Sequence, residues 1–125
     1  MKKGRYILLL SILTALFLIH VPEIDSADPE EANRMYAMAK KAYEDGFLDL
    51  SISEFEKYLA TYPTGEKRDR VLFYLGEIFL TQGKFSRAKG SLIKLKEEFP
   101  ASPLVERAIL ALAFSLFEQK EFSQA

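Results

Sequence analysis

The sequence predicts an all-α protein built from tandem antiparallel helix hairpins. Matching residues recur 37 positions apart, as Gly46 and Gly83 do, and as Pro63 and Pro100 do, each proline following an aromatic residue. A fixed period of 20 to 50 residues is typical of helical-repeat proteins. Between these glycines and prolines the apolar residues follow the helical period, and no run alternates with a period of two. We therefore expect helices and no strands.

The first predicted hairpin begins at Asp28. The segment Asp28–Glu31 reads Asp-Pro-Glu-Glu, which supplies an N-cap, a proline at the first helical position and acids at the positive end of the helix dipole. Gly46 predicts a turn into a second helix, which ends before Pro63 because the residue before proline disfavours helix. The apolar positions of the two helices are Met35, Met38, Ala39, Ala42 and Tyr43, then Leu48, Ile52, Phe55 and Leu59.

The second hairpin repeats this plan, with Gly83 at its turn. Its helices carry Val71, Leu72, Leu75, Ile78 and Phe79, then Phe85, Ala88, Leu92, Leu95 and Phe99. After it, Ser102-Pro103 predicts the start of a fifth helix that runs to about Gln119.

These residues resemble the tetratricopeptide repeat, a helix-turn-helix unit of 34 residues. The unit at residues 69–102 fits best, with small residues Gly76 and Ala88 where two helices would approach closely. The unit at residues 32–65 is more degenerate, and a third, incomplete unit covers residues 106–125, with Lys120 where a glycine is usual. The resemblance implies a short right-handed solenoid over residues 28–125.

The resemblance also implies a function, because first helices of such units line a concave groove that binds a partner segment. Here the corresponding positions are Tyr36, Lys40, Tyr43, Arg70, Phe73, Glu77, Arg107, Leu110, Phe114 and Phe117. Aromatic and basic residues suit a peptide with apolar side chains and some negative charge. The alternative is that Tyr36, Phe73 and Phe114 pack against neighbouring helices.

Residues 1–27 predict export. Lys2, Lys3 and Arg5 precede an apolar run over residues 7–19, which is typical of a signal peptide cleaved after Ser26 or Ala27. The alternative is an uncleaved signal anchor that holds the chain at the membrane through residues 7–21. The joints between the repeats also look like those of bacterial envelope proteins. We therefore expect a periplasmic or cell-envelope location.

Composition argues against several function classes. The chain of 125 residues has no cysteine and one histidine, His20 in the apolar run, so neither a thiol nor a histidine centre is available to catalysis. No spacing supports a metal site, and no cofactor is expected. The net charge of −1 argues against nucleic-acid binding. We therefore expect a non-catalytic module that interacts with proteins.

The predicted fifth helix is apolar almost all round, with Ser115 as its one polar break between Ala108 and Phe117. Such a helix is normally covered on several sides. Either the chain is part of a larger repeat protein, or the exposed face at residues 104–119 supports self-association or binds an apolar partner.

Overall fold

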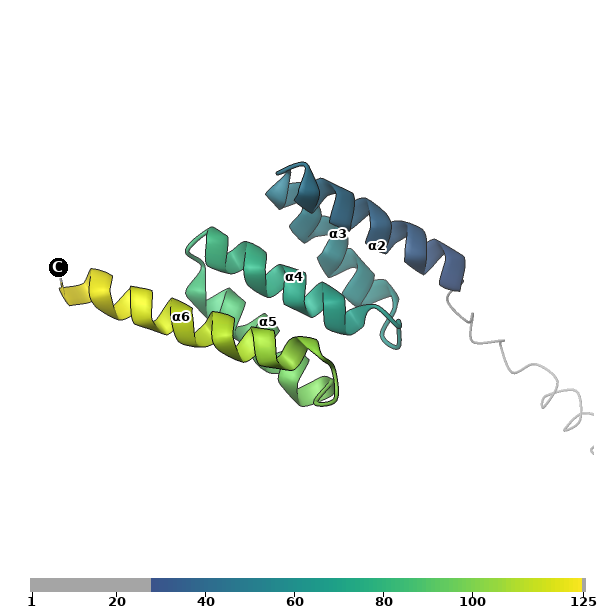
Figure 1. Ribbon diagram of the computed structural model, residues 1–125. Helices are drawn as coiled ribbons and strands as arrows, with labels where there is room; N and C mark the ends of the chain where they lie inside the picture. Colours follow the sequence, from purple (N-terminus) through teal and green to yellow (C-terminus); the bar gives the residue numbers. More distant parts are fainter. Residues whose placement is uncertain (1–27, 125) are drawn as a thin grey trace, which may run out of the picture.

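The computed structural model describes residues 28–124, and these form five helices and no strand (Figure 1). The predicted all-α class and the hairpin plan are therefore confirmed. The helices are α2 (Pro29–Glu44), α3 (Leu48–Thr61), α4 (Arg68–Thr81), α5 (Phe85–Glu98) and α6 (Leu104–Gln124).

The helices pack as two stacked hairpins followed by a single long helix. α2 packs on α3 and α4 packs on α5, while α6 lies against both α4 and α5. In Figure 1, α2, α4 and α6 form one layer, and α3 and α5 form a second layer behind it. The first layer therefore presents a surface to which three helices contribute.

Local chemistry at the helix ends matches the sequence prediction. The carboxylate of Asp28 accepts a hydrogen bond from the backbone N–H of Glu30 and so caps α2. Gly46 and Gly83 end α2 and α4 with φ of +81° and +70°. At both turns the next N–H reaches back to a carbonyl in the preceding helix, from Phe47 to Ala42 and from Lys84 to Phe79. Glycine is favoured here because residues that carry a side chain rarely adopt a positive φ.

Small residues set the distance between the helices of each hairpin. A Cβ atom at Gly76 would lie only 2.5 Å from Cγ of the buried Leu92, so the glycine lets α4 approach α5. In the first hairpin Ala39 and Ser51 are both completely buried, and the Ser51 hydroxyl donates a 2.9 Å hydrogen bond to the Ala39 carbonyl. The degenerate first unit therefore keeps the same close crossing.

The expected end of the last helix near Gln119 is wrong, because α6 continues to Gln124. The preceding turns each use a glycine with positive φ, whereas Lys120 occupies the third position of that series. Lysine is a good helix former and disfavours positive φ, so the helix continues.

The predicted export segment, residues 1–27, lies outside the described residues and stays a prediction. Within residues 28–124, no helix is sufficiently long and apolar to span a membrane.

Candidate functional site

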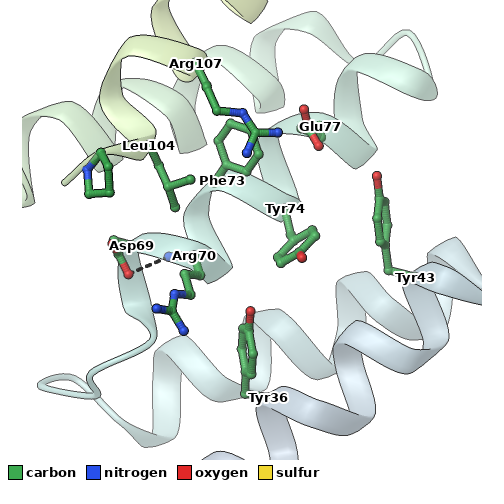
Figure 2. A pocket seen from close by; sticks show the side chains of 10 residues that line it. Tyr36, Tyr43, Asp69, Arg70, Phe73, Tyr74, Glu77, Leu104 and Arg107 are labelled. Carbon is green, nitrogen blue, oxygen red and sulfur yellow. Dashed lines mark hydrogen bonds between the residues drawn. The ribbon is translucent and has the colours of Figure 1, made fainter.

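A cleft of about 660 Å³ opens on the layer formed by α2, α4 and α6 (Figure 2). α4 supplies its centre, α2 supplies one wall, and the start of α6 supplies the other. The lining residues are Tyr36, Tyr43, Asp69, Arg70, Phe73, Tyr74, Glu77, Pro103, Leu104 and Arg107.

Three tyrosines form the aromatic part of the cleft. Tyr36 and Tyr43 are seven residues apart and so share one face of α2, and Figure 2 shows both rising toward α4. The Tyr74 ring stacks on Phe55 with centroids 5.4 Å apart and an interplanar angle of 8°. It also contacts Tyr43, at 5.1 Å between centroids. This packing restricts the rings, so a ligand would meet a largely preformed surface.

The hydroxyls of Tyr36 and Tyr43 are neutral hydrogen-bonding groups at physiological pH. Burial raises the pKa of Tyr36, and the neighbouring Tyr74 raises it further. Burial also raises the pKa of Tyr43, with additional contributions from Glu77 and Tyr74. Both side chains therefore remain protonated and can donate or accept hydrogen bonds to a ligand.

Two guanidinium groups supply positive charge to the cleft, and the neighbouring acidic residues form no ion pair with them. Arg70 and Arg107 are both exposed, and neither forms an ion pair with another described residue. The guanidinium of Arg107 lies over the Phe73 ring, 4.7 Å from its centroid. The Asp69 carboxylate is held by the Arg70 backbone N–H and the Ser102 hydroxyl, each at 2.7 Å.

Arg68 differs from Arg70 and Arg107 because it is buried and its guanidinium is bound within the fold. Its guanidinium donates to the carbonyls of Leu59 and Tyr62 and pairs with Glu98 at 3.1 Å. Arg68 thus ties α3, α4 and α5 together, whereas Arg70 and Arg107 remain available to a ligand.

The structure gathers part of the predicted groove in this cleft. Six predicted residues line it, namely Tyr36, Tyr43, Arg70, Phe73, Glu77 and Arg107. Phe73 is only 4% exposed and packs in the core with Leu72 and Leu92. This agrees with the alternative prediction that Phe73 packs against neighbouring helices.

The other four predicted residues lie outside the cleft. Lys40 pairs with Glu44 at 2.6 Å along α2. Leu110, Phe114 and Phe117 are exposed farther along α6 and do not line the cleft. The sequence prediction also missed Tyr74, although an aromatic beside Phe73 on the same predicted helix was a usable signal.

The fold and the cleft define an all-α helical-repeat protein with a concave, aromatic surface that carries two arginines without an ion-pair partner among the described residues. The family model described as "Tetratricopeptide repeat" matches residues 70–102, which cover most of α4, all of α5 and the joint to α6. The chain therefore contains a tetratricopeptide-like repeat, a module that generally binds other proteins or peptides and is generally non-catalytic. No curated protein matches the chain. Within the described residues, no three His, Cys, Asp or Glu side chains are grouped so that they could hold a metal ion.

Proposed function

We propose that this chain is a non-catalytic interaction module that binds an extended segment of another protein in the α2–α4–α6 cleft. The observation that carries the proposal is the pairing of packed tyrosine rings with two exposed guanidinium groups that have no ion-pair partner among the described residues. Aromatic and arginine side chains are the residue types that contribute most to protein interfaces. The matched repeat at residues 70–102 supports the same class of function.

The chemistry of the cleft indicates what the segment should carry. An apolar or aromatic side chain would pack on Tyr36, Tyr43 and Tyr74, and its backbone would accept or donate hydrogen bonds to the tyrosine hydroxyls. A carboxylate would pair with Arg70 or Arg107, since guanidinium binds carboxylate through two parallel hydrogen bonds. We therefore expect a segment with alternating apolar and acidic residues.

Selection from a display library of ten-residue peptides tests this proposal, followed by fluorescence anisotropy with the selected synthetic peptides. Arg70→Glu should weaken binding by about tenfold, the size of a lost charged contact. Lys89→Glu is the matched control, because it makes the same charge change on an exposed residue of α5 that does not line the cleft. Equal losses for both variants would show binding by net charge alone. Failure to select any peptide that binds the wild type would refute the groove.

We further propose that the module acts after export, in the bacterial cell envelope. Support comes from the basic and apolar pattern of residues 1–27. The intact mass of the native protein in soluble and membrane fractions tests the proposal. A mass reduced by 26 or 27 residues would support cleavage after Ser26 or Ala27. A full-length mass in the soluble cytoplasmic fraction would overturn export.

A further inference from the structure

The side of α6 that faces away from α4 and α5 exposes a continuous apolar surface. Leu110, Phe114 and Phe117 are 64%, 63% and 62% exposed, and Ile109 and Leu116 are about half exposed. By contrast, Ala108 and Ser115 on the opposite side of α6 are buried. The Ser115 hydroxyl donates to the Leu112 carbonyl, so even the polar break predicted from the sequence lies on the inward side. Apolar surface of this kind marks an interaction site.

The charges on this surface are arranged symmetrically about Ala113. At 100° per residue, seven residues return to nearly the same direction around a helix. Glu106 and Lys120 lie seven residues before and after Ala113, so both lie on the apolar side of α6. Both are exposed, and neither forms an ion pair with another described residue. The surface thus has a small residue at its centre, an acid at one end and a base at the other.

The opposite end of the stack has a different character. The shallow depression between α2 and α3 contains Met35 and Met38, but Glu31, Arg34 and Lys57 surround them. Head-to-tail stacking would bury these charges against the apolar side of α6, at a desolvation cost. Contact of α6 with the same face of a second copy avoids that cost and closes on itself as a two-fold dimer.

We propose that α6 pairs with α6 of a second copy of this chain in an antiparallel, two-fold arrangement centred on Ala113. In this register Glu106 faces Lys120 of the partner subunit, and Lys120 faces Glu106 of the partner subunit. Ile109 lies opposite Phe117 of the partner subunit, and the two copies of Ala113 meet at the axis, where a small side chain permits close approach. A parallel arrangement would instead place Glu106 against Glu106 and Lys120 against Lys120.

Site-specific cross-linking of the full chain tests the geometry, because the native sequence has no cysteine. Ala113→Cys should form a disulfide-linked dimer in mild oxidant, since only close Cβ atoms can be bridged. Ala60→Cys, an exposed alanine on α3, is the matched control and should remain monomeric on a non-reducing gel. Mixed Ile109→Cys and Phe117→Cys chains should link to each other more than either links to itself. Preferential self-linking of Ile109→Cys would overturn the antiparallel register.

A charge exchange measured by sedimentation equilibrium tests the pairing without a covalent bond. Glu106→Lys places two lysines at each end of the dimer and should raise the dimer dissociation constant about tenfold. Adding Lys120→Glu restores opposite charges and should return the constant to near the wild-type value. In a parallel dimer the single exchange would have no such effect.

Circular dichroism of each variant verifies that helix content is unchanged. A wild-type chain that stays monomeric at 100 μM or more would overturn the proposal and leave another protein as the occupant of this surface. The proposal would also be overturned if adding Lys120→Glu to Glu106→Lys did not return the dimer dissociation constant toward the wild-type value.

Discussion

Substitution of Gly76 by alanine should destabilise the protein although alanine is the better helix former. α4 and α5 cross at this residue, and a Cβ there would lie 2.5 Å from Cγ of Leu92. Leu92 is completely buried, so it cannot turn toward solvent to make room. The added methyl group must therefore force Leu92 from its rotamer or push the two helices apart.

The expected magnitude is a difference between two opposing effects. Replacement of glycine by alanine in a helix interior contributes about 1 kcal/mol of stability. Overpacking of a well-packed core costs about 1–3 kcal/mol, and this contact lies at the upper end because the neighbour is fully buried. We expect a net loss of about 1–2 kcal/mol in the free energy of unfolding, or roughly 5–15 °C in Tm for a domain of this size.

Gly90 provides the matched control, because it also lies inside a helix but a Cβ there would meet nothing within 4 Å. Gly90→Ala should raise the free energy of unfolding by about 0.5–1 kcal/mol. Urea unfolding followed by circular dichroism at 222 nm measures both variants. A Gly76→Ala protein at least as stable as the wild type would refute the close-crossing argument. If Gly90→Ala lowered the free energy of unfolding, the variant would not be reporting the gain in helix propensity, and it could not serve as the control.

Three further predictions concern other parts of the fold. Arg68→Met should lower the free energy of unfolding by about 2–3 kcal/mol, because buried carbonyls lose a donor and Glu98 keeps only its longer ion pair with Lys94, as a shifted urea midpoint would show. Gly46→Ala should cost about 1 kcal/mol in the same assay, since φ is +81° there. Burial raises the pKa of Tyr43 above 10.0, so the unfolded state loses its proton first and stability declines as pH rises above about 10. Tyr43→Phe should make that decline shallower in alkaline unfolding curves.

The parts of the fold that the sequence predicted well are those that local chemistry determines. Gly46 and Gly83 end helices because the backbone requires positive φ, and Asp28 begins one because its carboxylate caps the first turn. The end of α6 was predicted from the repeat period instead of from local chemistry. Lysine is a good helix former, so the helix continues through Lys120 although the 37-residue repeat period places a turn there.

The cleft was only partly predictable because its shape depends on contacts between distant segments. Tyr36, Tyr43 and Arg70 follow from their positions in the repeat. The position of Tyr74 beside Phe73 was a signal in the sequence, but its stacking on Phe55 of the preceding hairpin, which orients the ring in the cleft, does not follow from any spacing within α4. Phe73 packs in the core with Leu92 of α5 and Ala108 of α6, and these contacts between separate helices do not follow from the spacing within α4. The groove assignment itself stays a prediction until a ligand is measured.

The two proposed surfaces use different sides of α6 and so can act together. Arg107 contributes to the cleft, whereas the proposed dimer is centred on Ala113, six residues later. At 100° per residue, these two side chains point about 120° apart around the helix. Pairing of two copies at Ala113 would therefore leave Arg107 and the tyrosines of each cleft accessible. A dimer of this kind would present two clefts, and a partner carrying two matching segments would gain affinity through effective concentration without any new contact.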